Sequence, residues 1–178
     1  MTFEELLISS EFLNAYQSKT PAIFSNVDFL KPSWDQVINL LNEDIANDNP
    51  RGQWYLLNGW KTAGADRIPE VKQVSDTLMK YFDIYRDDQE EYPDVAGIFA
   101  SITTEPNAHG GMHNDKENIL FLQAKGSSKW IIFKDSGQPE YTFILEENDV
   151  LFYAGGKDHL VETITPRYAL SLSFGNKR

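Results

Sequence analysis

The feature that most constrains the fold is the succession of short apolar segments and glycine-containing turns from Val95 onward. Short segments rich in β-branched and aromatic residues follow one another there, separated by turns that contain glycine. These segments are 97–103, 118–124, 129–134, 141–145, 149–153, 160–164 and 168–174. Short strands at this spacing are typical of an antiparallel sandwich or barrel, and roughly seven or eight strands in ~80 residues suit a jelly roll. We therefore expect a mainly β chain, a double-stranded β-helix of the cupin-like jelly-roll type with flanking helices.

The first half of the chain, residues 1–94, is expected to contain helices with the first strands between them. Ser10 is a good N-cap for a helix over 11–17, and Pro21 breaks that helix before a strand over 19–24. Ser33 and Gln36 form a capping box for a further helix. The apolar face of that helix is expected to be Trp34, Val37, Ile38, Leu41 and Ile45.

Pro69 opens another helix, because proline suits the first helical position. Its expected buried residues are Val71, Val74, Leu78 and Phe82. No linker long enough to separate domains interrupts the chain. We expect one double-stranded β-helix domain over 1–178, in which 1–94 is a helical N-terminal elaboration and 95–178 is the barrel core.

Composition limits the partners and the compartment. Aspartate and glutamate total 27 against 16 lysines and arginines, a net charge of −11, which makes nucleic acid and anionic membranes poor partners. Without cysteine, disulfides are excluded and any metal needs nitrogen and oxygen ligands. The start carries early acids and no cationic region typical of a signal peptide, and no apolar run approaches the ~18 residues that span a membrane. We expect a cytoplasmic protein. The acidic stretch 87–94 is expected to be a solvated loop that weakly favours a basic substrate.

Two histidines and one aspartate carry the clearest chemistry. His113 and Asp115 are two residues apart, so on an extended segment they project to the same side while Asn114 points away. His159 follows a strand and a glycine turn, so it would enter from a different strand. Two imidazoles and a carboxylate form a facial triad that holds non-heme Fe(II) and leaves positions open. A zinc site with three protein ligands remains an alternative. His109 is expected on a loop above the site.

An arginine, Arg167, follows the second histidine by eight residues and suggests that the site binds an organic acid through its carboxylate. On the strand that begins at Arg167, the odd positions Arg167, Ala169, Ser171 and Ser173 form one face and apolar residues form the other. An arginine among small residues suits bidentate pairing with an organic acid inside a barrel. Lys129 is the second candidate for this role. In the alternative interpretation, Arg167 only reaches water and Lys129 faces solvent.

The segments 113–130 and 149–159 resemble the cupin-like JmjC group of 2-oxoglutarate oxygenases. That group shows His-x-Asp, a hydrophobic strand ending in glutamine, a glycine turn, then a basic residue and tryptophan, and residues 11–16 and 19–23 are similar to its N-terminal helix and first strand. The resemblance implies that His113, Asp115 and His159 bind Fe(II), with 2-oxoglutarate and O2 as cosubstrates. It implies hydroxylation of a peptide or protein side chain or of a small molecule, with release of succinate and CO2.

One position departs from the pattern of the group. Ser128 stands where the group usually places the lysine or arginine that binds 2-oxoglutarate, and Lys129 is one step away, on the opposite face by alternation. Arg167 resembles the arginine that holds the cosubstrate on this late strand in the prolyl-hydroxylase branch of the superfamily. We therefore expect Arg167 to bind 2-oxoglutarate, with Lys129 and Ser173 as further candidate cosubstrate residues. No catalytic residue is expected beyond the metal ligands.

Two other function classes are compatible with the same motifs. A non-redox metal-binding cupin, either an isomerase or a ligand-sensing module, would keep the triad without needing Arg167. A degenerate interaction domain would need neither the metal nor the arginine, which the complete triad disfavours.

Overall fold

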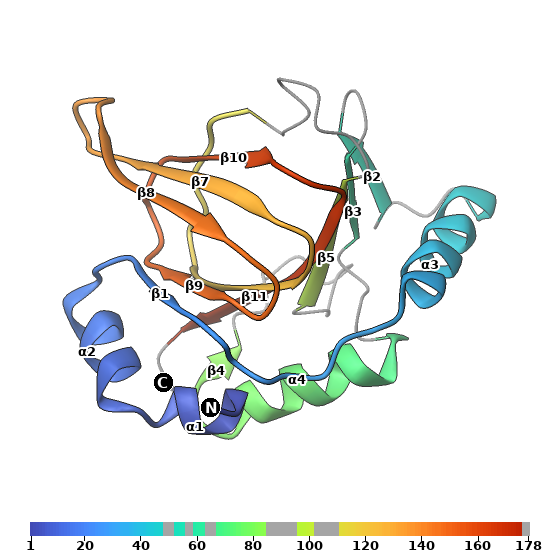
Figure 1. Cartoon of the computed structure of the whole chain (residues 1–178), viewed down its shortest axis with the longest axis horizontal. Helices are drawn as coiled ribbons and strands as arrows, with labels where there is room; N and C mark the ends of the chain where they lie inside the picture. Colours follow the sequence, from blue (N-terminus) through green and yellow to red (C-terminus); the bar gives the residue numbers. More distant parts are fainter. Residues whose placement is uncertain (48–51, 56–58, 63–66, 85–95, 102–110, 176–178) are drawn as a thin grey trace.

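Two antiparallel sheets face one another in the computed structural model, which describes residues 1–47, 52–55, 59–62, 67–84, 96–101 and 111–175 (Figure 1). The helices are α1 (Phe3–Leu7), α2 (Ser10–Ser18), α3 (Trp34–Ala46) and α4 (Pro69–Met79). The strands of the first half are β1 (Ala22–Phe24), β2 (Gly52–Tyr55), β3 (Gly59–Thr62) and β4 (Asp83–Ile84). The later strands are β5 (Ala96–Ser101), β6 (Asn118–Lys125), β7 (Ser128–Phe133), β8 (Pro139–Leu145), β9 (Val150–Tyr153), β10 (His159–Thr163) and β11 (Arg167–Gly175).

The large sheet has the strand order β1-β9-β6-β11-β5-β3-β2, with β4 also paired to β11, and the small sheet has the order β10-β7-β8. Figure 1 shows the small sheet across one face of the large sheet and helices α1, α2 and α4 on the other side. The expected mainly β jelly roll with flanking helices is confirmed. Every strand expected from residue 97 onward is present close to its expected bounds.

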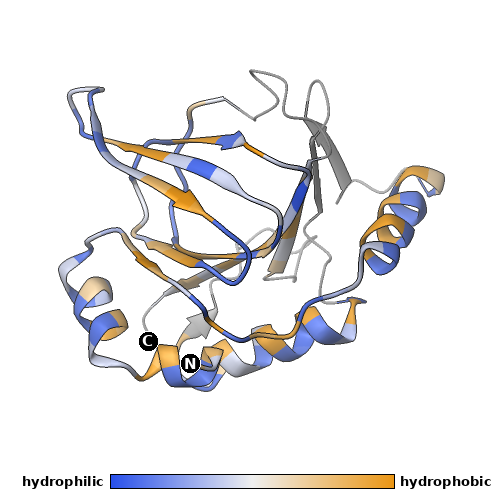
Figure 2. Ribbon diagram, in the orientation of Figure 1, coloured by the Kyte–Doolittle hydropathy of each residue, from blue (hydrophilic) through white to orange (hydrophobic). Residues whose placement is uncertain are grey.

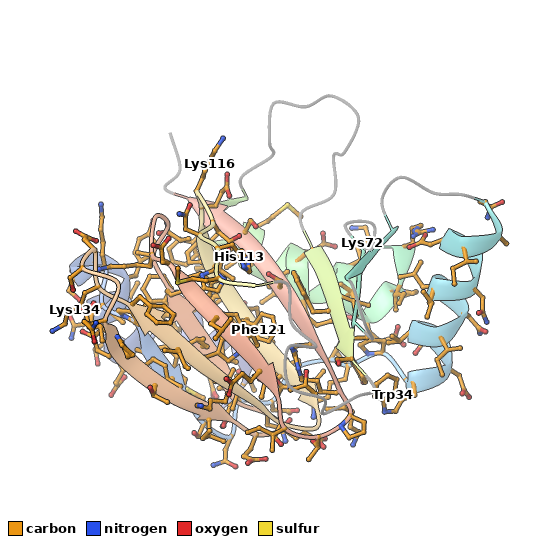
Figure 3. All side chains as sticks on the ribbon, turned by 90° about the horizontal axis from the view of Figure 1, so that it is seen from above. Trp34, Lys72, His113, Lys116, Phe121 and Lys134 are labelled. Carbon is orange, nitrogen blue, oxygen red and sulfur yellow. The ribbon has the colours of Figure 1, made fainter. Side chains whose placement is uncertain are left out.

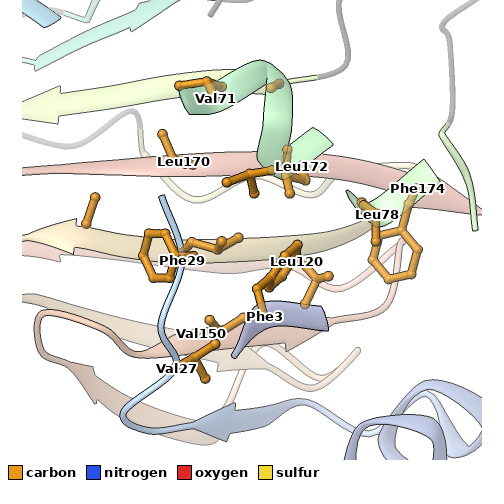
Figure 4. Close-up of a cluster of buried hydrophobic side chains, with 14 of the residues drawn as sticks. Phe3, Val27, Phe29, Val71, Leu78, Leu120, Val150, Leu170, Leu172 and Phe174 are labelled. Carbon is orange, nitrogen blue, oxygen red and sulfur yellow. The ribbon is translucent and has the colours of Figure 1, made fainter. Parts of the chain in front are cut away.

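Strand alternation divides the buried residues into two layers. Between the large sheet and the helices lies a cluster that includes Leu120, Leu170 and Phe174 with Leu78 of α4 (Figure 4). Between the two sheets lies a second cluster, Ile119, Phe121, Trp130, Ile132, Leu145, Leu151, Tyr153 and Ala169. The central strands are therefore covered on both faces, which explains why β6 is a nearly unbroken apolar run rather than an alternating one.

The helices are amphipathic, and Figure 2 shows hydrophilic and hydrophobic residues on each of them. The expected buried side of α4 is confirmed, since Val71, Val74, Leu78 and Phe82 are all buried. The capping box of α3 is also confirmed, with Ser33 and Gln36 hydrogen-bonded reciprocally. None of the helices in the described part of the chain has both the length and the hydrophobicity to cross a bilayer.

The expected apolar face of α3 is wrong in part. Ile38 and Ile45 are 47% and 55% exposed, while the buried residues of this helix are Val37, Leu40 and Asp44. The contact face is therefore narrower and turned from the one that hydrophobicity alone indicates. A charged residue is buried there because Asp44 forms an ion pair with Arg67, with 2.7 Å between Oδ1 and Nη2.

Candidate metal centre

Three potential metal ligands converge between the two sheets. The donor atoms of His113, Asp115 and His159 all lie within 4.8 Å of one another. The Nε2 atom of His159 is 3.7 Å from Oδ2 of Asp115, and the two imidazole centroids are 4.3 Å apart. His159 is 1% exposed whereas His113 is exposed, so the cluster lies at the mouth of the barrel. Figure 3 shows Lys116 extending away from the protein next to His113.

Backbone pairing brings these residues together from distant parts of the sequence. His113 and His159 form an antiparallel bridge, in which each N–H donates to the other's carbonyl oxygen at 3.1 and 2.8 Å. The N–H of Gly156 donates to the carbonyl oxygen of Asp115 at 2.6 Å. The side chain of Asn114 instead donates to Asp158, at 2.8 Å. His113 and Asp115 therefore share one side although the segment forms only an isolated bridge.

The orientation of both imidazoles suits a metal. The Nδ1 atom of His113 is 3.0 Å from the carbonyl oxygen of Gly111, and Nδ1 of His159 is 3.0 Å from that of Lys157. A carbonyl oxygen only accepts hydrogen bonds, so in the neutral imidazole each Nδ1 carries the hydrogen and each Nε2 offers its lone pair to a metal. Burial lowers the pKa of His159, which favours the neutral form that binds metals.

Tyr153, at the end of β9, is the hydrogen-bond partner of the carboxylate. Its hydroxyl donates to Oδ2 of Asp115 at 2.6 Å. Burial, together with the Asp115 charge, raises the pKa of Tyr153 well above its usual value. The sequence motifs that indicate the triad do not include Tyr153. Its position on the inward face of β9, directly before the glycine turn, is the signal that could have indicated it.

Arg167 is buried between the sheets with an unused donor. It is 6% exposed, its Nε donates to Oγ1 of Thr163 at 3.1 Å, and its guanidinium carbon is 5.9 Å from the Phe121 ring centroid. Its Nη1 is buried and has no hydrogen-bond partner among the described residues. Burial lowers the pKa of Arg167 to about 10, so it remains a cation at neutral pH. A buried cation with a spare donor is the environment that an anionic ligand would complete.

The structure does not bring Lys129 to this site. Its Nζ pairs with Glu162 at 3.0 Å on the outer face of the small sheet, whereas the neighbouring Ser128 and Trp130 are buried on the inner side. Ser128 donates to Oε1 of Gln123 at 2.7 Å, so this inner position is occupied by a neutral hydrogen-bonded pair. The cation available to the barrel interior among these candidates is Arg167.

Ser173 lies on the same inward face of β11 as Arg167, but near the opposite end of the strand. Six residues separate the two, which is about 20 Å along a strand. Ser173 instead pairs with Ile119, near the end of β6 that adjoins Tyr153. His109 and the acidic stretch 87–94 lie outside the described residues.

Trp130 is a second residue near the triad whose contact with it does not follow from the sequence motifs. Its indole stacks on the imidazole of His159, with 5.4 Å between centroids and 22° between planes. Its Nε1 is buried and, in the part of the chain that is described, has no hydrogen-bond partner. The barrel interior therefore carries two donors that lack a partner among the described residues: Nε1 of Trp130 beside His159, and Nη1 of Arg167 near Thr163 at the other end of β10.

Comparison with solved structures finds the same architecture in YcfD, a ribosomal oxygenase from Escherichia coli. Its complex with cobalt and 2-oxoglutarate aligns with a TM-score of 0.67 at 15% identity, over 94% of this chain and 51% of YcfD. Its complex with cobalt and succinic acid gives the same values. The chain shares the jelly-roll fold of this oxygenase. It spans about half the length of YcfD, and no family model or curated protein matches it by sequence. The resemblance to the JmjC group that the motifs indicated is confirmed at the level of the fold.

Proposed function

We propose that this chain is an Fe(II)- and 2-oxoglutarate-dependent oxygenase that hydroxylates a peptide or protein side chain or a small molecule, releasing succinate and CO2. The observation that carries the proposal is Arg167, a buried cation whose Nη1 has no partner among the described residues, in the barrel whose mouth holds the His-Asp-His cluster. A structural metal site or a metal-binding cupin without an acidic cosubstrate gives no reason for that arginine.

The residues of the triad fit a catalytic rather than a structural metal. His113, Asp115 and His159 would hold Fe(II) through two imidazole nitrogens and one carboxylate oxygen, leaving coordination positions for cosubstrates. When bound, iron with 2-oxoglutarate and O2 supplies the oxidative chemistry, while the protein supplies position and exclusion of water. The chain's own contribution is visible in the fixed tautomers of both histidines and in the burial of His159.

Arg167 would bind the distal carboxylate of 2-oxoglutarate. Strand β10 carries His159 at one end and Thr163, which fixes the guanidinium, at the other. The Cα atoms of His159 and Thr163 are about 13 Å apart along an extended strand. The buried side chains of His159 and Arg167 reach into the barrel from these two points. A short dicarboxylic acid suits this span. The complexes of YcfD, a protein of the same fold, with cobalt and either 2-oxoglutarate or succinic acid support this choice of ligand.

A peptide or protein substrate is supported by YcfD, which has the same fold and is a ribosomal oxygenase. The net charge of −11 favours a basic rather than an acidic substrate by simple attraction. We place the activity in the reducing cytoplasm, where iron stays ferrous.

The test is succinate formation from 2-oxoglutarate by iron-reconstituted protein, measured with and without added Fe(II). We expect iron-dependent succinate from the wild-type protein and none from Asp115→Ala, because the variant lacks one of the three metal ligands. Asp135→Ala, an exposed aspartate in the turn between β7 and β8, is the matched control and should behave as wild type. Metal binding without succinate would instead support the non-redox cupin, and equal succinate from Asp115→Ala would exclude the proposed triad.

A further inference from the structure

We infer that Tyr153 is a positioning residue for Asp115, whose carboxylate it holds in one orientation toward the metal. This role rests on the proposed metal centre and deepens it. The tyrosine hydroxyl and the carboxylate are linked by a hydrogen bond of 2.6 Å, within the short range typical of charge-assisted O–H···O bonds.

The tyrosine ring is itself held firmly. Tyr153 is 2% exposed, and its ring lies 5.4 Å from that of Trp130 and 4.8 Å from that of His159. Both neighbours come from the small sheet, while Tyr153 belongs to the large sheet. The hydroxyl is therefore presented to Asp115 by a packed aromatic cluster rather than by a mobile side chain.

Among the three proposed ligands, Asp115 is the one whose metal-binding group is fixed by a hydrogen bond from a described side chain. The imidazoles of His113 and His159 are oriented by backbone carbonyl groups of Gly111 and Lys157. Backbone partners survive most substitutions, whereas the partner of Asp115 is removed by taking away one oxygen atom. This difference makes the contribution of Tyr153 measurable by itself.

The backbone of Asp115 is fixed independently of the tyrosine. Its carbonyl oxygen accepts from the N–H of Gly156 at 2.6 Å. The turn packs closely against the same segment, because a Cβ atom at Gly155 would lie 2.2 Å from the carbonyl oxygen of Lys116. Loss of the Tyr153 hydroxyl should therefore release the carboxylate without releasing the residue that carries it.

The bond is made to the oxygen that faces the metal position. Oδ2 of Asp115 accepts from Tyr153 and is also the atom 3.7 Å from Nε2 of His159. A donor on this oxygen occupies one of its lone pairs and restricts rotation about the carboxylate, which favours binding of a metal through a single oxygen. Without the donor, the carboxylate is free to rotate and to bind through both oxygens, taking a position otherwise open to a cosubstrate.

The experiment is anaerobic titration of the metal-free protein with Co(II), followed by calorimetry and by the visible absorption spectrum. Tyr153→Phe keeps the ring and removes the hydroxyl. We expect cobalt affinity to fall by about 10–100-fold, the range seen when a hydrogen-bond partner of a metal ligand is lost. We also expect an altered cobalt spectrum, which a purely structural role would not produce.

Tyr141→Phe is the matched control, since Tyr141 packs against the same cluster between the sheets and its hydroxyl forms no hydrogen bond with the described residues. It should leave affinity and spectrum unchanged. Thermal unfolding of both metal-free variants separates a folding defect from a change at the metal. Should Tyr153→Phe be partly unfolded, the titration and the spectrum are repeated for all proteins at a lower temperature, at which thermal unfolding shows that each is folded.

The outcomes distinguish this role from the proposed function. If the wild-type protein binds cobalt and Tyr153→Phe binds it with the same affinity and spectrum, the positioning role is wrong and the metal centre stands. If the wild-type protein binds no cobalt, the metal centre itself is wrong, and the role of Tyr153 is overturned with it.

Discussion

At the scale of single residues, burial and strand parity separate two cations that look equivalent in the sequence. Arg167 is enclosed between the sheets with one donor, Nη1, that meets no acceptor in the described part of the chain, and burial lowers its pKa only to about 10. Lys129 lies on the outer face of β7 in an exposed ion pair with Glu162. A buried charge costs free energy unless a ligand or partner completes it, whereas an exposed pair is worth little. The two positions should therefore respond very differently to substitution.

Arg167→Ala should raise the KM for 2-oxoglutarate by at least about 30-fold, because truncating one partner of a buried charge pair costs about 2–5 kcal/mol. Lys129→Ala is the matched control and should change KM little, since its partner is the exposed Glu162. Steady-state succinate formation at varied 2-oxoglutarate measures both. A larger effect at Lys129 than at Arg167 would contradict the assignment.

At the scale of elements, the sequence predicts correctly that helix α3 begins after Ser33, but it does not predict which face of that helix is buried. A capping box is a local arrangement of two side chains with neighbouring backbone groups, so residues 33–36 suffice to specify it. Which side of α3 is buried depends instead on what the rest of the chain places against it. Ile38 and Ile45 are exposed while Asp44 is buried against Arg67. The hydrophobic periodicity of the helix does not predict that ion pair, because Arg67 lies outside the helix.

Ser33→Ala should destabilise the protein by about 1 kcal/mol, because it removes the side-chain acceptor for the N–H of Gln36 at the start of α3. The structure places the N-cap of α2 at Ser9 rather than at the expected Ser10, which is the first residue of the helix. Ser10→Ala is therefore the matched control, since Ser10 is exposed and, among the described residues, its hydroxyl bonds the neighbouring Glu11. Urea unfolding of the metal-free proteins measures both free energies. A loss at Ser10 equal to that at Ser33 would show that the cap is not the cause.

At the scale of the whole molecule, the candidate metal centre joins the two sheets. His159 begins β10 of the small sheet, whereas Asp115 is bonded to Tyr153 at the end of β9 in the large sheet. An ion held by both would link the sheets at the mouth of the barrel. Metal binding should therefore stabilise the entire domain rather than only a loop.

Mn(II) or Co(II) should raise the Tm of the wild-type protein. By mass action, the free energy of unfolding rises by about 2.7 kcal/mol at a metal concentration 100 times Kd. A chelator should reverse the shift. Asp115→Ala should show no comparable shift, because a ligand is missing. An equal shift in both proteins would mean that the metal stabilises some other site.

Much of the architecture follows from the sequence alone. The strand succession from residue 97, the proline start of α4 and the cap of α3 arise from local chemistry: β-branched runs, turn glycines, a fixed proline φ and side-chain acceptors. The convergence of His113, Asp115 and His159 was also foreseeable, because residue types and alternation limit how such groups can meet on neighbouring strands.

Only the tertiary structure decided the rest. It placed the Tyr153 hydroxyl on Asp115 and turned Lys129 outward to Glu162. It also buried Nη1 of Arg167 where no described residue accepts a hydrogen bond from it. These facts depend on pairing register and on the closure of one sheet over the other. A shift of one residue in register reverses every side chain of a strand, so the inner surface of the barrel is fixed only when all the strands are in place.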